Sequence, residues 1–464
     1  MDKERKKRLR TIKLIVTEVI MVVAIAVMVV ILTMLAMGYN LNKDGELGQS
    51  GLVQIKSIPT GAEVIIDGEM IAPHTNTSRM LSAGKHQIKL QKEGYDSWNK
   101  EIESESGWLL KLDYARLFLQ NRTAEKVREY DGDFKFIVPA SDGSQIIYAT
   151  DNSTKWKLLN IRSDDVSEME LDVAEITAGL EIKNVFWNEN NDKLLVMTKK
   201  GEATEWLLIN TKDINNSINL SRQFGMDFSD VKFLTADGQR LLGLEQGNLR
   251  LITVSNKTVS QVMAKNVDNY YTDSGNIIYS KKADDKYMMM LYQEATEDVL
   301  VTEFPKDSRV KLALSQYLGK KYLMFTVNNR MYVYRGELPT AERTLSEMEL
   351  VIESDIDFIP DNLTVWTDDQ LVMARKAEKI AMFDAELGKL YNYEVESDKV
   401  FFLDMYLIGT IVDNKLIVRD FDGGNRRELA NATGASVITI NHKWLYYCTK
   451  INDKVNIFRE KIVD

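Results

Sequence analysis

The chain holds few residues of the kinds that assemble metal sites. Its three histidines are His74, His86 and His442, and its single cysteine is Cys448. Because none of them has a second histidine or cysteine at ligand spacing, we expect no transition-metal site. One cysteine also excludes intramolecular disulfides. The sequence has neither a Gly-x-Ser-x-Gly elbow nor a Walker loop. We therefore expect no catalytic residues, no cofactor and no bound metal.

Carboxylates are the abundant reactive group, with 69 Asp and Glu residues. Pairs such as Glu168/Glu170 and Asp368/Asp369 are expected on solvated surface. The stretch Asp420–Asn425 resembles an oxygen-rich calcium loop but lacks the spacing and closing Glu of an EF-hand, so we expect a turn. Two carboxylates about 5–10 Å apart would still suffice for a hydrolase or lyase of surface glycans. That enzyme is the alternative to a binding protein.

Aromatic rings are a second kind of side chain that could bind a ligand, and the chain has 7 Trp, 19 Tyr and 15 Phe residues. Most should lie in the core, because in alternating strands they share a face with Leu, Ile and Val. Trp98, which follows the turn residues Gly94-Tyr95-Asp96-Ser97, is the ring that we expect to be exposed for surface contact. Rings could also stack on sugars where loops converge.

The first 40 residues predict how these groups are held at a membrane. Residues 2–13 carry seven Lys or Arg against Asp2 and Glu4, a net charge of +5. Val19 to Met37 follows, with Thr33 as its only polar side chain. A helix of this length covers about 28 Å, close to the hydrocarbon thickness of a bilayer. We expect a cytoplasmic basic arm over residues 1–13 and one transmembrane helix over residues 14–38.

The orientation and the retention of this helix follow from its flanks. Basic residues before it and polar residues after it place the N-terminus in the cytosol and the bulk of the chain outside. A cleaved signal peptide is the competing interpretation, but its apolar region would be about 7–15 residues long. The run is longer here, and Leu35-Ala36-Met37-Gly38 is a poor cleavage site. The pattern favours an uncleaved signal anchor in the cell membrane.

Charge limits the partners of the part outside the membrane. The chain carries −10 in total, the arm carries +5 and Glu18 carries −1, so −14 remains beyond the helix. An acidic ectodomain repels nucleic acid and anionic headgroups. We expect a protein or a cell-wall or surface glycan as partner, no nucleic acid, and membrane contact through one helix.

A small β domain is expected after a polar linker at residues 39–50. Val53 and Ile55 alternate with polar residues, and so do Ile88 and Leu90. Asp67-Gly68 follows three apolar residues and signals a tight hairpin, because Gly accepts the positive φ of such turns. The pattern predicts a β-sandwich-like domain over residues 51–117.

The residues of this stretch resemble the PEGA domain family. The family is named for a Pro-x-Gly-Ala turn, here Pro59-Thr60-Gly61-Ala62, and the Asp67-Gly68 hairpin and a later Gly94-Tyr95 occur in the same order. The family usually has a Thr-Pro pair after the hairpin, whereas this chain has Ala72-Pro73-His74-Thr75. The resemblance implies an envelope-associated prokaryotic protein with a structural or binding module and no catalytic residues. Pro59, Gly61, Ala62, Asp67 and Gly68 are expected to be structural.

From residue 120 to residue 464 a looser unit recurs, made of a turn, an apolar strand, a second turn and an aromatic-rich strand. Eight units of roughly 43 residues are typical of a β-propeller of four-stranded blades. The units resemble WD40-like and TolB-like blades, and because the last three lack an Asp-Gly turn, the count is seven or eight. The last unit has no room for a fourth strand, so we expect residues 124–130 to supply it beside residues 454–460.

Together these patterns predict an all-β ectodomain on one N-terminal transmembrane helix. The ectodomain would hold a small PEGA-like sandwich and a propeller of seven or eight blades, whose loops we expect to contact the partner. We expect a binding or scaffold protein of the prokaryotic cell envelope that is not an enzyme.

Overall fold

The protein is described by a computed structural model that covers residues 2–36, 39–41, 47–71, 73–151, 153, 155–162, 165–273, 275–294, 297–366, 370–432, 439–441 and 443–464. The chain divides into two units, residues 1–121 with 463–464 and residues 122–462. His442 and the Asp368/Asp369 pair lie outside the described residues.

The N-terminal segment is one helix, α1 (Asp2–Ala36). Its residues Lys13–Met34 have a mean hydropathy of 3.0, and none of the apolar window is buried against protein. The hydroxyls of Thr17 and Thr33 each donate to the carbonyl four residues earlier at 2.8 Å, so these polar groups are satisfied inside the helix. Residues 2–13, which were expected as a separate basic arm, belong to the same helix, since α1 begins at Asp2.

The linker expected at residues 39–50 is in part a β-hairpin, so that prediction was wrong. β1 (Tyr39–Leu41) pairs antiparallel with the start of β2 (Leu47–Ile58), Tyr39 lying opposite Gln49. Residues 42–46 lie outside the described residues. The Gly and polar content suggested a stalk, but backbone pairing does not require apolar side chains.

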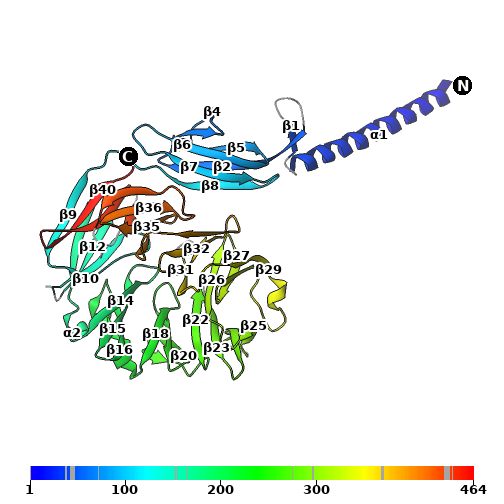
Figure 1. The fold of residues 1–464 in the computed structure, drawn as a ribbon. Helices are drawn as coiled ribbons and strands as arrows, with labels where there is room; N and C mark the ends of the chain where they lie inside the picture. The colour runs from blue at the N-terminus through cyan, green and yellow to red at the C-terminus, as the bar shows by residue number, and fades with distance from the viewer. Residues whose placement is uncertain are drawn as a thin grey trace. The chain divides into compact units, whose positions relative to one another are not determined.

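Two four-stranded sheets build the small domain (Figure 1). In the first sheet β2 pairs with β1, β5 and β8, and the second has the order β4-β3-β6-β7. The remaining strands are β3 (Glu63–Ile66), β4 (Glu69–Ile71), β5 (Thr77–Ser82), β6 (Gly84–Gln91), β7 (Trp98–Ser104) and β8 (Leu109–Arg116). Alternate residues point inward, among them the fully buried Val53, Val64 and Leu90. The domain is the expected sandwich of two sheets around one apolar core.

The second unit contains eight four-stranded antiparallel sheets within the part of the chain that the structure describes. We number them as blades one to eight in chain order. Blade one consists of β10 (Phe134–Pro139), β11 (Gln145–Thr150), β12 (Trp156–Arg162) and β13 (Asp165–Leu171), and blade two of β14 (Glu181–Trp187), β15 (Lys193–Lys200), β16 (Ala203–Asn210) and β17 (Ile218–Asn219). Blade three consists of β18 (Phe228–Phe233), β19 (Arg240–Glu245), β20 (Asn248–Thr253) and β21 (Thr258–Val259), and blade four of β22 (Val267–Asp273), β23 (Asn276–Lys282), β24 (Lys286–Leu291) and β25 (Val299–Pro305).

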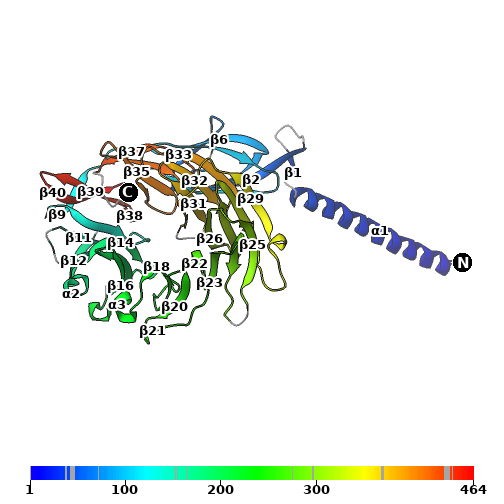
Figure 2. The ribbon, with the colours of Figure 1, turned by 60° about the horizontal axis from the view of Figure 1, so that its bottom comes forward.

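Blades five to eight continue the ring, coloured from yellow-green to red in Figures 1 and 2. Blade five consists of β26 (Val310–Tyr317), β27 (Lys320–Val327), β28 (Arg330–Arg335) and β29 (Glu349–Asp355), and blade six of β30 (Asn362–Val365), β31 (Leu371–Lys376), β32 (Lys379–Asp384) and β33 (Lys389–Glu394). Blade seven consists of β34 (Val400–Phe402), β35 (Leu407–Val412), β36 (Lys415–Asp420) and β37 (Arg427–Asn431), and blade eight contains β38 (Thr439–Asn441), β39 (Trp444–Ile451) and β40 (Lys454–Lys461). Short helices α2 (Ala174–Thr177) and α3 (Leu220–Phe224) and the 3₁₀ turns η1 (Ile214–Asn216) and η2 (Leu345–Glu347) lie in connections.

Each repeat found in the sequence corresponds to the two middle strands of one blade, from β11/β12 to β39/β40. The Asp-Gly turn of the early units lies between the first and second strands, as Asp142-Gly143 does between β10 and β11. Asp142 Oδ1 accepts from the Ser144 amide at 2.9 Å, and in blade seven Asp404 Oδ1 accepts from the Tyr406 amide at 2.8 Å without a following Gly. The part of the chain that the structure describes therefore holds eight blades, the larger of the two expected numbers.

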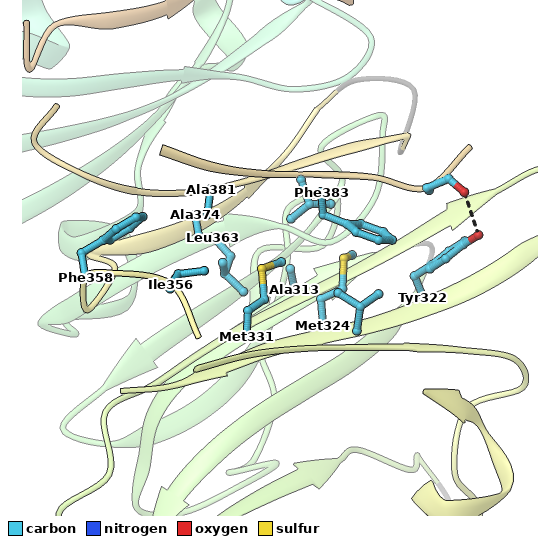
Figure 3. Close-up of a cluster of buried hydrophobic side chains, with 13 residues drawn as sticks. Ala313, Tyr322, Met324, Met331, Ile356, Phe358, Leu363, Ala374, Ala381 and Phe383 are labelled. Atoms are coloured by element: carbon cyan, nitrogen blue, oxygen red, sulfur yellow. Dashed lines mark hydrogen bonds between the residues drawn. The ribbon is translucent and has the colours of Figure 1, made fainter. Parts of the chain in front are cut away.

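The blades pack against each other through apolar layers, as between blades five and six (Figure 3). Met324 and Met331 of blade five face Phe383 of blade six, and all three are fully buried. The Tyr322 hydroxyl donates to the carbonyl of Ala385 at 3.3 Å, so its polar end is satisfied. Each sheet thus depends on both neighbours to cover its two apolar faces.

The last blade is completed by the first strand of the unit, β9 (Ala124–Asp131). β9 pairs antiparallel with β40, with Lys454 opposite Asp131 and Glu460 opposite Ala124. This is the pairing that the sequence predicted, and it brings cyan β9 beside red β40 in Figure 1. The pairing ties the first strand of the unit to its last strand, so blade eight has four strands like the others and β40 lies inside the sheet.

A polar cluster around Glu168 joins blade eight to blade one. The Glu168 carboxylate on β13 accepts hydrogen bonds from the hydroxyls of Tyr130 on β9 and Tyr148 on β11, and from Lys157 Nζ at 3.1 Å. Arg128 Nε lies 3.6 Å away. Burial raises the pKa of Glu168, but these donors outweigh it and the pKa is lowered overall. The anionic form of Glu168 therefore stabilises the closed ring.

We predict that Glu168→Gln destabilises the ring closure by about 1–3 kcal/mol near neutral pH, because it removes a partly buried, charge-assisted hydrogen-bond cluster. The folded pKa lies below the ordinary value of 4.5. The contribution is thus fully present above pH 4.5 and is lost as the pH falls through the folded pKa. Denaturant-dependent hydrogen exchange of the β9 and β13 segments measures the free energy.

Glu170→Gln is the matched control, since Glu170 lies two residues along β13, is 52% exposed and pairs with Lys155 at the surface. We expect it to change the stability by less than about 0.5 kcal/mol. Equal effects of the two substitutions, or a Glu168 effect that persists unchanged at low pH, would contradict the role of the cluster.

Candidate functional site

The Pro-x-Gly-Ala turn is held from within by Thr75. The backbone of Gly61 donates to the Thr75 carbonyl at 2.8 Å, and the backbone of Ala62 donates to the Thr75 hydroxyl at 2.9 Å. Ser57 Oγ lies 2.7 Å from the same hydroxyl and donates to the Pro59 carbonyl. Ala62 is fully buried and Gly61 has a φ of 76°. These hydrogen bonds hold the turn within the fold, and Thr75 is the residue that the sequence argument missed.

The second motif is a tight hairpin that a histidine anchors. Asp67 and Gly68 have φ of 53° and 87°, as the two-residue loop between β3 and β4 requires. The Asp67 carboxylate lies 2.7 Å from His86 Nδ1 and accepts from the Gln87 amide at 2.9 Å. Burial lowers the pKa of His86, but the hydrogen bonds to Asp67 and to the Ser82 carbonyl outweigh it and raise the pKa overall. His86 is thus a structural residue of the hairpin.

The prediction that Trp98 is an exposed ring is wrong. Trp98 starts β7 on its inward face and is fully buried, with its ring 5.9 Å from that of Tyr114 on β8 in an edge-to-face arrangement. The preceding turn residues suggested a loop, but the strand begins at the Trp itself. Trp108, which precedes β8, is 67% exposed instead. The sequence pattern could not separate the two, because each ring stands at a strand start.

Apolar side chains accompany Trp108 on the outer face of the first sheet. Leu52 on β2 lies opposite Met80 on β5 and opposite Leu109 on β8. All three are between 38% and 49% exposed. This exposed row is a candidate contact surface of the small domain.

The propeller offers a cavity along its inner strands. About 490 Å³ is enclosed by the first strands of blades two to six, which place Phe186, Lys232, Tyr271, Lys311 and Thr364 on its wall. Such a volume is in the range of small-molecule sites. We call this space the channel cavity. Residues of five consecutive blades, two to six, converge on it.

Lys232 is the most constrained cation of the channel cavity. Its Nζ donates to the Tyr270 carbonyl at 2.7 Å, lies 4.3 Å from the centre of the Tyr270 ring and is 3.5 Å from Asp230 Oδ2. Enclosure by the protein lowers the pKa of Lys232, Asp230 opposes that effect, and the charge of Lys311 adds to it. A bound anion would relieve the repulsion between the two lysines.

Two carboxylates, Asp230 and Asp361, reach the channel cavity. Asp230 is 37% exposed and Asp361 is exposed. Three buried carboxylates of the described residues lie elsewhere and have polar partners: Asp384 accepts from Gln370 at 2.9 Å, Asp420 from Asn425 at 2.8 Å and Glu460 from Tyr447 at 2.7 Å. Burial raises the pKa of Asp384 to about 6. Among the residues lining the cavity, the acids are therefore solvated rather than buried as a pair.

The loop that resembled a calcium site is a turn. Asp422 Oδ1 accepts from the Gly424 amide at 3.0 Å, and Asp420 Oδ2 accepts from Asn425 Nδ2 at 2.8 Å. Within the described residues no group of three or more His, Cys, Asp or Glu side chains is arranged to hold a metal ion.

Comparison with known proteins identifies the small domain. Residues 50–116 match the model of the PEGA domain, one residue offset from the range expected. A search of curated proteins finds no match to this sequence.

Solved β-propellers resemble the second unit. The propeller domain of Cps50 (Swd1) from Myceliophteria thermophila is 10% identical with a TM-score of 0.40, over 72% of this chain and 99% of that one. PorZ, a surface component of the type-IX secretion system of Porphyromonas gingivalis, is 12% identical with a TM-score of 0.43, over 71% and 43%. An oligogalacturonate lyase in complex with manganese is 10% identical with a TM-score of 0.41, over 72% and 98%. These likenesses are weak, so the blade count rests on the strand pairing itself.

We predict opposite effects of truncating the two tryptophans of the PEGA domain. Trp98→Ala empties a fully buried site and should cost about 3–5 kcal/mol, whereas Trp108→Ala should change the stability by less than about 0.5 kcal/mol. Hydrogen exchange of residues 50–116 in the full chain reads out the local stability. Strong destabilisation by Trp108→Ala would show that the exposed ring has a structural role.

Proposed function

We propose that the protein is a membrane-anchored binding protein of the prokaryotic cell envelope, with its N-terminus in the cytosol and its bulk outside. The observation that carries this proposal is the bare surface of α1. Its side chains from Leu14 to Leu32 include Val22 and Ile20 at 63% exposure, and no protein surface covers them. Lys13–Met34 spans about 33 Å as a helix, which matches the apolar thickness of a bilayer.

The basic residues of the first turns support the orientation. Lys and Arg are retained on the cytosolic side of a first membrane helix, so residues 2–13 would stay inside. The PEGA domain and the propeller then lie outside the cytosol. The −14 charge of that part disfavours nucleic acid as partner.

The domain composition supports binding rather than turnover. The PEGA motif residues form internal hydrogen bonds of the fold, and the propeller places its channel cavity where several blades meet. Neither acid at that cavity is buried, since Asp230 is 37% exposed and Asp361 is exposed, which suits a binding wall better than a general acid whose carboxyl must be held protonated. We infer that the propeller presents loops and the channel cavity to a protein or glycan of the envelope.

The orientation is tested with a single exposed thiol. Cys448 is buried, so it serves as an unreactive background, and Ala341→Cys adds a thiol at an exposed loop position. We expect a membrane-impermeant maleimide to label this variant in intact spheroplasts as fully as after lysis. The parent chain should stay unlabelled in both. Labelling only after lysis would place the propeller in the cytosol.

Binding is tested with the full chain in nanodiscs of neutral lipid. We expect it to co-sediment with isolated cell walls or to retain a component of membrane extracts, whereas empty nanodiscs should not. Retention in neither would overturn the binding function. Release of new reducing ends from a surface glycan, abolished by Asp230→Asn or Asp361→Asn, would instead identify the hydrolase or lyase with paired carboxylates.

A further inference from the structure

Positive charge gathers at one end of the channel although the part of the chain beyond the helix is acidic. A second cavity of about 510 Å³ shares the lining residues Lys311 and Asp361 with the channel cavity, so the two are adjacent. Five cations and three carboxylates line it: Lys282, Lys306, Arg309, Lys311 and Lys376 against Asp268, Asp307 and Asp361. We call this second cavity the channel mouth. Its wall is net positive within a region of net charge −14.

The channel mouth is formed by the connections that lead into inner strands and by the ends of second strands. Lys306 and Arg309 lie between β25 and β26, and Asp361 directly precedes β30, so these connections enter the inner strands of blades five and six. Lys282 and Lys376 end the second strands β23 and β31 of blades four and six. Three consecutive blades therefore contribute to one wall.

Most cations of the mouth have no carboxylate within 4.0 Å among the described residues. Lys282 pairs with Asp268 at 3.3 Å. The other four, Lys306, Arg309, Lys311 and Lys376, form no such pair in the described part of the chain, which contrasts with the many ion pairs on the outer strands. Like charges gathered without counter-charges repel each other, and an anion placed among them gains from all of them.

The backbone under these cations is fixed. The Arg309 amide donates to Asn328 Oδ1 at 3.1 Å, and the Asn328 amide donates back to the Arg309 carbonyl at 2.8 Å. The Asp361 amide donates to the Arg375 carbonyl at 2.9 Å. A preorganised loop loses little conformational entropy when a ligand binds.

Deeper in the channel, charge is combined with an aromatic face. Lys232 and Lys311 line the channel cavity together with Phe186, which is 47% exposed and stacks on Trp206 with ring centres 6.4 Å apart. The fixed ring offers an apolar surface to the ring carbons of a sugar, while the ammonium groups offer hydrogen bonds to carboxylate or phosphate oxygens.

We propose that the channel mouth and channel cavity bind an acidic glycan, a sugar polymer carrying carboxylate or phosphate groups. This inference rests on the binding function proposed above and names its ligand class. A nucleic-acid duplex fits less well, because a long stiff polyanion would also meet the acidic remainder of the propeller. A flexible acidic chain can enter the mouth with a few residues only.

The test measures binding of the full chain in neutral-lipid nanodiscs to polygalacturonate, poly(glycerol phosphate), dextran and duplex DNA. We expect at least one of the two acidic polymers to bind, with an affinity that falls as salt screens the charges, and dextran to bind far more weakly. Preference between carboxylate and phosphate polymers then distinguishes the two sources of negative charge.

Substitutions locate the site. Lys311→Gln and Arg309→Gln should each weaken binding about tenfold, since a charge-assisted hydrogen bond is worth roughly 1.4 kcal/mol or more. Lys320→Gln is the control, because Lys320 is exposed at the start of β27, opposite Tyr317 at the far end of the inner strand β26, and lies outside both cavities. Unchanged hydrogen exchange in blades four to six confirms that the variants are folded.

Binding that survives both channel substitutions would lie elsewhere, for instance on the basic residues 2–13, and would overturn the proposal. Binding of neither acidic polymer, or tighter binding of DNA, would overturn it as well. In those cases retention on cell walls by the unsubstituted chain and by Lys311→Gln alike would leave the binding function intact. The two proposals therefore fail separately.

Discussion

The propeller depends on the backbone pairing between β9 and β40. Every other blade is made of consecutive strands, so its hydrogen bonds form over short chain distances. Blade eight alone joins segments more than 300 residues apart. Without that pairing β40 would be an open edge, and the apolar layer between blades eight and one, which includes Tyr148, Tyr446 and Ile457, would lose the packing of Val127 and Tyr130 on β9. The Glu168 cluster adds charge-assisted hydrogen bonds at the same junction.

Closure also determines where function can reside. In a closed ring the flat faces of the sheets pack against each other and are buried. Only the outer strands, the loops and the central channel are then exposed to a partner. The outer strands carry ion pairs such as Arg335–Glu349 and Lys286–Glu303, whose charges neutralise each other. At the channel mouth Arg309 and Lys311 have no such partners among the described residues. Because the charges named on the outer strands are paired and these two at the channel mouth are not, within the described part of the chain, the channel mouth is the candidate binding surface.

The PEGA domain shows how a motif can be recognised correctly while its neighbours are not. The glycine and proline turns were predictable because they follow from backbone conformation, which a residue type restricts locally. The burial of Trp98 and the exposure of Trp108 were not predictable, because Trp98 begins β7, Trp108 directly precedes β8, and only the position of the facing sheet separates the two rings. Thr75 escaped for the same reason: it holds Pro59–Ala62 from the far side of the β3–β4 hairpin, and no local pattern marks it.

The sequence alone was enough to predict the apolar helix, the turn positions and the eight-fold repetition, because each follows from local periodicity or residue type. It also predicted the strand that completes the last blade, because the last repeat has no room for a fourth strand of its own. The charge of each segment could be counted as well, but which charges come together depended on the tertiary structure. Lys232, Lys311 and Phe186 are separated by 46 to 125 positions in the chain, and they share one cavity because the ring turns the inner strand of each blade toward a common axis.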